Sequence, residues 1–163
     1  MHKTRYIDVT PTLDTNIYAN GDILFDTTAV ALGTPVNQGA VYLTDLMVFD
    51  KDDQTAYIFD VYFLRSNTSI GTFNAAPNIS DANAVEVIGR VRFDGTATAP
   101  EIVTDLGGSK LYYKNSGNVG LPLMLTPVTA TPTNVYMAAV CVTGTPTHTA
   151  TGMVVRLGIL ERM

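Results

Sequence analysis

The stretch Phe49–Asn67, FDKDDQTAYIFDVYFLRSN, joins a cluster of acids to a run of aromatic and β-branched residues. Residues 57–64 predict a strand, in which successive side chains point to opposite faces. One face would carry Tyr57, Phe59, Val61 and Phe63, and the other Ile58, Tyr62 and Leu64 around Asp60. A sandwich strand in a monomer normally has one polar face. A loop or a neighbouring subunit should therefore cover the second face.

Similar runs, bounded by Gly, Asn, Pro and Asp, recur along the chain and have the composition of strands. They predict strands at about 5–9, 23–31, 41–49, 55–65, 85–93, 101–104, 110–114, 121–126, 134–142 and 153–161. Only Ser80–Ala84, SDANA, indicates a helical turn, with Ser or Asp as its N-cap. We therefore predict an all-β fold: a single-domain, antiparallel β-sandwich of the jelly-roll type at 21–163, after an extended N-terminal segment at 1–20.

The composition favours a covering subunit over a covering loop. Charged residues make up 15% of the 163 residues and hydrophobic residues 46%, whereas an average soluble domain has roughly 25% charged residues. Such a chain is expected to bury part of its apolar surface against other subunits. The residues expected at the subunit interface are Asp45, Tyr57, Asp60 and Tyr62.

Several function classes are disfavoured. The net charge of −5 and the lack of a basic run argue against direct nucleic-acid binding. The N-terminus MHKTRYIDVT has no apolar core of an export signal, and no run of about 18 apolar residues predicts a membrane span. Cys141 is the only cysteine and lies in an apolar run, which indicates a buried, inert thiol. No glycine-rich phosphate motif opens a helix, which disfavours nucleotide binding. We expect a soluble protein that is synthesised in a cytoplasm and has no cofactor.

The acids Asp50, Asp52 and Asp53 raise the question of a calcium loop. An EF-hand loop beginning at Asp50 would need Gly and Glu where the sequence has Thr55 and Val61. Because the acids lie between two strand patterns, we interpret them as the loop of a β-hairpin, where Asp is favoured. A weak surface metal at Asp50–Asp53, or a contact with a partner, remains as the alternative.

A hairpin with its loop at 51–54 would place Asp45 opposite Asp60 on one sheet face. Two close carboxylates raise the pKa of one of them, as in acid and base pairs of enzymes. The other interpretation, which we favour, is that each Asp meets an Arg or a backbone amide, of the same chain or across a subunit boundary. His2 and His148 are the only histidines, too few for a His-rich metal site, and no nucleophile is evident.

Four stretches resemble a group of tailed-bacteriophage virion proteins similar to capsid cement, or decoration, proteins. They are RYIDVTPTLDTNIYANGDILFDTTAVA (5–31), GAVYLTDLMVFDKDDQ (39–54), NVGLPLMLTP (118–127) and VYMAAVCVTGTPTHTATGMVVRLGILE (135–161). The resemblance follows most of the chain in order, on short, turn-like motifs. It implies a jelly-roll body without enzyme activity, and homotrimers on the outer surface of an icosahedral capsid that clamp the major capsid protein.

No functional residue is carried over from this group, but polar, turn-rich segments indicate where a capsid would be contacted. The expected capsid contacts are His2, Arg5, Tyr6 and Tyr18 in the N-terminal segment, with the loops 66–84 and 114–120, because these polar segments are free to reach a partner. Two other functions stay open. One is a trimeric receptor- or carbohydrate-binding module of a phage tail or head fibre, with Tyr42 or Tyr112-Tyr113 as a stacking face, and the other is an enzyme that uses Asp45 and Asp60.

Overall fold

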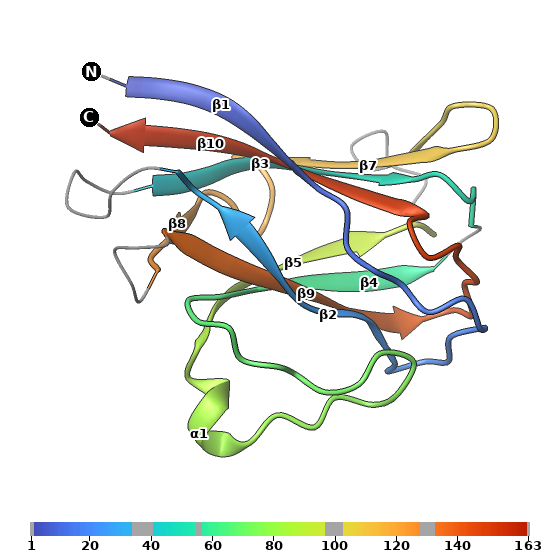
Figure 1. The fold of residues 1–163 in the computed structure, drawn as a ribbon. Coiled ribbons are helices and arrows are strands. Elements are labelled where there is room, and N and C mark those ends of the chain that lie inside the picture. Colours follow the sequence, from blue (N-terminus) through green and yellow to red (C-terminus); the bar gives the residue numbers. More distant parts are fainter. Residues whose placement is uncertain (1, 34–40, 55–56, 97–102, 128–132, 163) are drawn as a thin grey trace.

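The computed structural model describes residues 2–33, 41–54, 57–96, 103–127 and 133–162. These residues form two antiparallel sheets packed face to face (Figure 1). Sheet A contains β1 (His2–Val9), β3 (Val41–Asp50), β6 (Val103–Asp105), β7 (Lys110–Asn115), β8 (Leu123–Leu125) and β10 (Met153–Arg162). Sheet B contains β2 (Ile23–Ala31), β4 (Ile58–Leu64), β5 (Val87–Asp94) and β9 (Asn134–Thr143).

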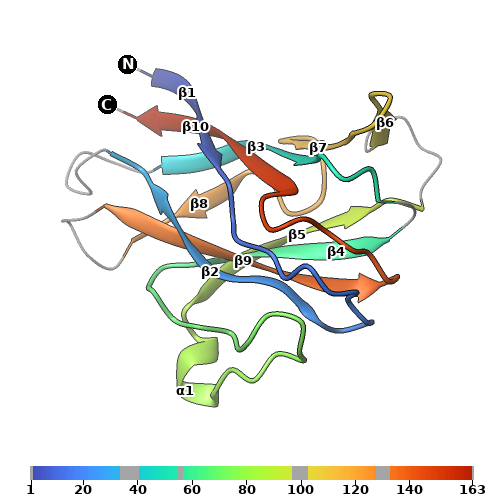
Figure 2. The ribbon, with the colours of Figure 1, turned by 45° about the vertical axis from the view of Figure 1, so that its right-hand side comes forward.

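The strand order is that of a jelly roll. Sheet A runs β1-β10-β3-β7-β6, with β8 also paired to β3, and sheet B runs β2-β9-β4-β5. Figure 2 shows β6 beyond β7 at the edge of sheet A. Because the chain passes repeatedly from one sheet to the other, most strands pair with partners distant in sequence. The predicted all-β, antiparallel jelly-roll sandwich is confirmed.

The predicted elements coincide closely with the observed ones. Each strand expected from the sequence overlaps one strand of the structure, and the helical turn is α1 (Asp81–Ala84). Ser80 is its N-cap, and its side chain accepts a hydrogen bond from the amide of Asn83. The described part of the chain contains no helix with the length and hydropathy needed to cross a bilayer.

The core lies between the sheets and is centred on aromatic rings. Phe59 on β4 stacks on Phe93 of β5 and on Tyr57, with ring centroids 5.1 and 5.0 Å apart. Tyr112 of β7, from the opposite sheet, meets Phe59 edge-on at 5.1 Å. These side chains are fully buried, so they join the two sheets. Cys141 is also in this core, and burial raises its pKa to about 11, as expected of an inert thiol.

The connection from β3 to β4 is not the predicted hairpin. β3 pairs with β10, β7 and β8, whereas β4 pairs with β5 and β9. The acids after Phe49 therefore lie where the chain crosses from sheet A to sheet B. Asp45 and Asp60 consequently belong to different sheets and do not form the carboxylate pair that a hairpin would have produced.

The second face of β4 is covered by a loop of the same chain, contrary to the preference for a subunit. Ile23, Leu64, Ile70 and Ala138 form a small buried cluster on the outside of sheet B, against which Tyr62 and Ile79 pack. Ile70 and Ile79 belong to the segment 65–80 that runs from β4 to α1 below sheet B (Figure 1). Part of the loop 66–84, which was expected to contact a capsid, therefore packs on the outer side of sheet B of the same chain.

The N-terminal residues are part of the sandwich. β1 pairs with β10 from His2 opposite Arg162 to Val9 opposite Val155, and forms the edge of sheet A. Leu13 and Tyr18, in the connection to β2, are buried in the main core. The Tyr18 hydroxyl donates to the carbonyl of Leu24 at 3.0 Å. Residues 2–18 therefore complete the domain, where the sequence suggested a separate extended segment.

Candidate functional site

The outer face of sheet A has no covering loop comparable to that of sheet B in the described part of the chain. Register places Val154, Phe49 and Leu111 side by side, and likewise Arg156, Met47 and Tyr113 in a neighbouring row. The apolar side chains on this face, all partly or largely exposed, are Tyr42, Met47, Phe49, Leu111, Tyr113, Met124, Val154 and Leu160. We call this set the sheet A patch.

Charged side chains border the sheet A patch and pair with one another. Arg156 lies with its guanidinium carbon 5.1 Å from the centre of the Phe49 ring. Both carboxylate oxygens of Asp8 on β1 accept from Arg156, at 2.7 and 2.8 Å. A guanidinium neutralised in this way can lie over an aromatic ring without leaving free charge at the patch.

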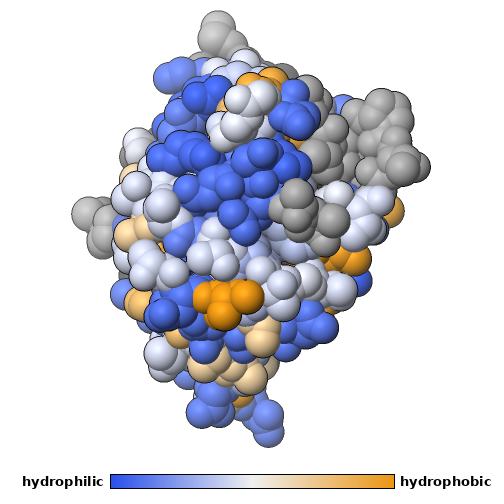
Figure 3. All heavy atoms as spheres, turned by 90° about the vertical axis from the view of Figure 1, so that its right-hand side faces the viewer, coloured by the Kyte–Doolittle hydropathy of each residue, from blue (hydrophilic) through white to orange (hydrophobic). Residues whose placement is uncertain are grey.

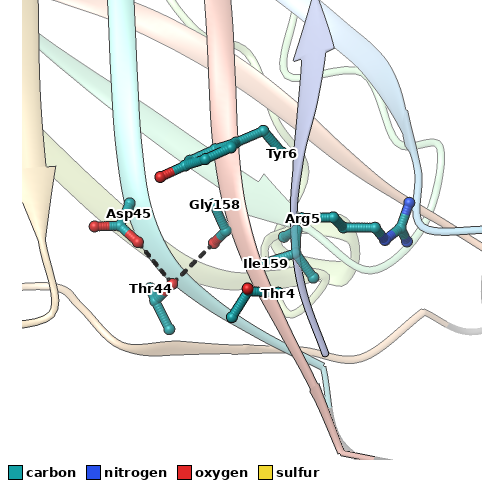
Figure 4. Close-up of a pocket in the computed structure, with 7 residues that line it drawn as sticks. All are labelled: Thr4, Arg5, Tyr6, Thr44, Asp45, Gly158 and Ile159. Atoms are coloured by element: carbon teal, nitrogen blue, oxygen red, sulfur yellow. Dashed lines mark hydrogen bonds between the residues drawn. The ribbon is translucent and has the colours of Figure 1, made fainter. Parts of the chain in front are cut away.

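A pocket of about 240 Å³ opens at the same face, between β1, β10 and β3 (Figure 4). Asp45 is held there by the hydroxyl of Thr44, at 2.8 Å, and by that of Tyr113, at 3.1 Å. Figure 4 shows the Tyr6 ring reaching from β1 across Gly158 toward Asp45. A Cβ at Gly158 would lie 2.8 Å from Asp45, so glycine there leaves room for the carboxylate. Asp45 is thus paired with neutral hydroxyls, whereas an Arg or a backbone amide was expected.

Asp60 is buried on the outer side of sheet B and is paired within the chain. Arg92, directly opposite on β5, donates to both of its oxygens at 2.8 and 2.9 Å, and Arg90 adds a contact at 3.3 Å. The Asp60 side chain is 2% exposed, whereas those of Arg90 and Arg92 are about half exposed. The favoured interpretation, that this Asp meets an Arg, is confirmed.

Replacing Asp60 with asparagine is expected to lower the free energy of unfolding by about 1.5–3 kcal/mol, because hydrogen bonds to a buried charged group are the stronger kind. Chemical denaturation of both proteins measures the loss. Asp8→Asn is the matched control: Asp8 makes the same two-pronged contact with Arg156 but is 49% exposed, so its loss should cost less than about 1 kcal/mol. If both substitutions lowered the free energy of unfolding equally, burial would not explain the effect at Asp60.

The other predicted contact residues are divided between surface and core. Tyr6 is 60% exposed, and Arg5 pairs with Glu161 at 2.7 Å. Tyr18 and Tyr57 are buried in the core, so their side chains cannot reach a capsid or a subunit. Tyr112, suggested as a stacking face, is also fully buried. Tyr62 packs under the 65–80 segment, and the side chain of His2 lies outside the described residues.

A second polar cluster lies where β3 ends and β10 begins; the sequence raised its acids as an alternative metal loop but did not connect them with His148. It consists of Asp50, Asp52 and His148, and we call it the corner cluster. Nδ1 of His148 is 3.7 Å from Oδ1 of Asp50 and 3.5 Å from Oδ2 of Asp52. The side chains of Asp50 and His148 are fully buried, and that of Asp52 is 17% exposed. The two loops that form it are 97 positions apart at the Asp52–Thr149 contact, so only the fold brings them together.

Backbone and side-chain groups fix both carboxylates of the corner cluster. Asp50 accepts from the amides of Asp52 and Gln54, at 3.0 and 3.2 Å. Asp52 accepts from the amide of Thr149 at 2.8 Å and from its hydroxyl at 3.0 Å. Gln54 in turn accepts from the amide of Thr147 at 2.8 Å. The two loops are therefore tied together independently of His148.

Burial dominates the protonation of the corner cluster. It lowers the pKa of His148 below 6.5, although the nearby carboxylates of Asp50 and Asp52 act the other way. Burial also raises the pKa of Asp50, against the effect of His148 and of the two amides. A neutral imidazole is therefore favoured at neutral pH, and a neutral imidazole has one nitrogen free to accept a proton or bind a cation.

Comparison with protein-family models and with curated proteins finds no match. Among solved structures, a chain of tomato aspermy virus aligns with 11% identity and a TM-score of 0.41, over 99% of this chain and 78% of the other. A chain of cocksfoot mottle virus aligns with 9% identity and a TM-score of 0.35, over 99% and 84%. The insecticidal delta-endotoxin Cry8Ea1 of Bacillus thuringiensis aligns with 11% identity and a TM-score of 0.39, over 97% of this chain and 23% of the toxin. These likenesses carry no inference about function.

Proposed function

We propose that this chain is a structural virion protein of a tailed bacteriophage, a cement protein that binds the outside of the icosahedral capsid as a homotrimer and stabilises it. Two lines of support come from the sequence and the fold. The four stretches named above resemble such proteins across most of the chain. The jelly roll that this resemblance implies is the fold of the described residues.

The observation that carries the proposal is the sheet A patch. The 65–80 segment covers part of the outer side of sheet B, whereas Met124 on sheet A is 49% exposed and Tyr6 at its edge is 60% exposed. The other members of the patch are partly exposed, and contiguous, partly exposed apolar side chains bordered by charged groups are typical of a protein contact surface. With only 15% charged residues in the chain, a flat apolar face is suited to a permanent contact with another protein chain.

The mechanism would be stabilisation by linkage. A protein that binds only the mature, expanded shell lowers the free energy of that state by mass action. Trimers that bridge neighbouring capsid subunits engage several sites at once, so each trimer dissociates more slowly than a single subunit would. Many such contacts around a closed shell would oppose the pressure of the packaged DNA. This role needs no reacting group, which agrees with the internal pairing of Asp45 and Asp60.

Copy number tests the proposal most directly. A stained gel of purified particles is expected to show this protein at about one copy or more per major capsid subunit. A band at a few copies per particle would overturn the cement role and favour the fibre module, for which the pocket beside Tyr6 and Asp45 offers an aromatic ring and a carboxylate. Copy number thus decides between the two candidates.

Met47→Asp tests the sheet A patch itself. A charge at the centre of the patch should convert trimers into monomers and reduce binding to capsids that lack the protein by roughly 100-fold or more, since a desolvated unpaired charge costs several kcal/mol. Light scattering after size exclusion measures the first effect, and sedimentation with capsids the second. Ala29→Asp, on an exposed strand position of sheet B, is the control and should leave both unchanged. A trimeric Met47→Asp variant with normal binding would rule out the patch.

A further inference from the structure

The corner cluster contains buried polar atoms that have no hydrogen-bond partner among the described residues. Both ring nitrogens of His148 are inaccessible and have no hydrogen-bond partner among the described residues. The same holds for the hydroxyls of Tyr57 and Tyr112, and the Tyr57 ring meets the His148 ring edge-on at 5.8 Å. Burial and the charge of Asp50 raise the pKa of both tyrosines. A buried, unpaired imidazole directed at two carboxylates is costly unless something binds between them.

The spacing of the three side chains is that of ligands around a cation. The His148 Nδ1 contacts at 3.5 and 3.7 Å are longer than good hydrogen bonds. Ligand atoms about 2.0–2.2 Å from a tetrahedral metal lie roughly 3.3–3.6 Å from one another. One ligand atom from each residue falls within 4.8 Å of the others. The amides of Asp52, Gln54 and Thr149 already hold the two carboxylates. A small movement of these side chains would therefore place all three ligand atoms at metal-binding distance.

We propose that Asp50, Asp52 and Nδ1 of His148 form a binding site for a first-row divalent cation, with Zn²⁺ as the best match. Imidazole and carboxylate ligands suit zinc, whereas calcium and magnesium prefer oxygen ligands throughout. Within the described residues, no lysine or arginine lies within ion-pair distance of either carboxylate, and Lys110 pairs with Asp53 instead. A divalent cation would neutralise the two carboxylates together and join the β3–β4 and β9–β10 loops.

The surroundings of the site support binding. Each carboxylate oxygen of Asp50 accepts from one amide and keeps a second lone pair, whereas Oδ2 of Asp52 accepts from the Thr149 amide and shares the Thr149 hydroxyl with Oδ1. Such outer contacts hold metal ligands in place. The partly exposed side chain of Asp52 gives the ion a path from solvent. Figure 3 shows the end of the sandwich where β3 ends and β10 begins, whose surface is largely hydrophilic, with hydrophobic atoms in small separate patches. A hydrated cation can approach such a surface.

Calorimetric titration of the full chain, prepared without a histidine tag and treated with a chelator, tests the site. ZnCl₂ is expected to bind at one ion per chain and raise the melting temperature, with MgCl₂ and CaCl₂ much weaker. His148→Gln and Asp52→Asn should each weaken zinc binding by roughly 100-fold or more, since even outer contacts are worth 10–100-fold. Binding should also weaken on acidification, because protons compete for the ligands.

Asp53→Asn is the matched control. It removes the same charge from the same loop, but Asp53 pairs with Lys110 and lies outside the cluster. Its φ of 54° is one that asparagine accepts readily. Zinc affinity should therefore stay within a few-fold of the original. Circular dichroism of each variant without metal shows whether it is folded. If the Asp52 variant does not fold, the zinc affinity of His148→Gln alone tests the site.

The two histidines allow a readout at atomic level. Nitrogen-detected NMR of the imidazoles contains only His2 and His148, and zinc should shift Nδ1 of His148 while Nε2 keeps its proton. Absence of stoichiometric zinc binding would overturn the proposal. So would equal affinity in His148→Gln, or binding that is lost in His2→Gln. None of these outcomes depends on copy number in the particle, so the proposed function is tested separately.

Discussion

Phe59→Ala is expected to lower the free energy of unfolding by about 3–5 kcal/mol, the range for removing a buried aromatic ring. Phe59 is fully buried and lies between Tyr57 and Phe93, with Tyr112 of sheet A at its edge. Its loss leaves a cavity at the point where the two sheets meet. Denaturant unfolding followed by circular dichroism measures the change, as a lower midpoint with an unchanged slope.

Two further variants separate the causes. Phe59→Leu fills most of the cavity but loses the ring contacts, and it should cost clearly less than alanine. Phe73→Ala removes a ring that is 40% exposed, in the 65–80 segment, and should cost less than about 1 kcal/mol. If Phe59→Ala cost no more than Phe73→Ala, the aromatic cluster would not be what joins the sheets.

Gly152→Ala is expected to lower the free energy of unfolding by about 2–4 kcal/mol, through overpacking and lost hydrogen bonds. A Cβ at Gly152 would lie 1.6 Å from Oδ2 of Asp52. The Asp52 side chain would have to leave, and its bonds to the amide and hydroxyl of Thr149 would break. Thermal and denaturant unfolding measure the loss. The variant should also lose the proposed zinc binding.

A double-mutant cycle assigns this effect to Asp52. In an Asp52→Ala background the obstructing carboxylate is gone, so Gly152→Ala should cost at least about 1 kcal/mol less than in the native chain. Gly117→Ala is the control, because its nearest contact is 3.2 Å away, at the Asn115 side chain. It should cost less than about 1 kcal/mol. Equal costs of Gly152→Ala in both backgrounds would show that the conflict lies elsewhere.

The strand positions and the need of Asp60 for an Arg or amide partner could be predicted, because they depend on local chemistry, although the sequence placed this residue at a subunit interface. The run of β-branched and aromatic residues from Ile58 to Leu64 favours a strand through its own composition, and it is one in the structure. Ser80 caps a helical turn by contacting an amide three residues away. Asp60, in mid-strand among apolar residues, needs an Arg or an amide as its partner in any fold that buries it. Arg92 supplies that partner.

The hairpin prediction failed because a loop sequence does not determine which sheet the next strand joins. A turn rich in Asp fits a hairpin and a crossing between sheets equally well, since both need polar loop residues. Here β3 pairs with β10, β7 and β8 in sheet A, whereas β4 pairs with β9 and β5 in sheet B, so β3 and β4 do not pair with each other. The choice therefore rests on nonlocal pairing. The covering of sheet B by the 65–80 segment was missed for the same reason, because Ile70 and Ile79 are isolated apolar residues in a polar stretch.

By itself the sequence determined the secondary structure, the all-β class and the need for something to cover the apolar strand faces, since backbone preference and side-chain alternation are local properties. The tertiary structure decided which cover each face receives: the chain's own loop on sheet B, and the open sheet A patch. It also brought His148 next to Asp50 and Asp52. The adjoining contact joins Asp52 to Thr149, which are 97 positions apart in the sequence. Such contacts form only when each strand has taken its place in one of the two sheets. The free energy that drives this arrangement comes from burying the apolar side chains of the whole core together.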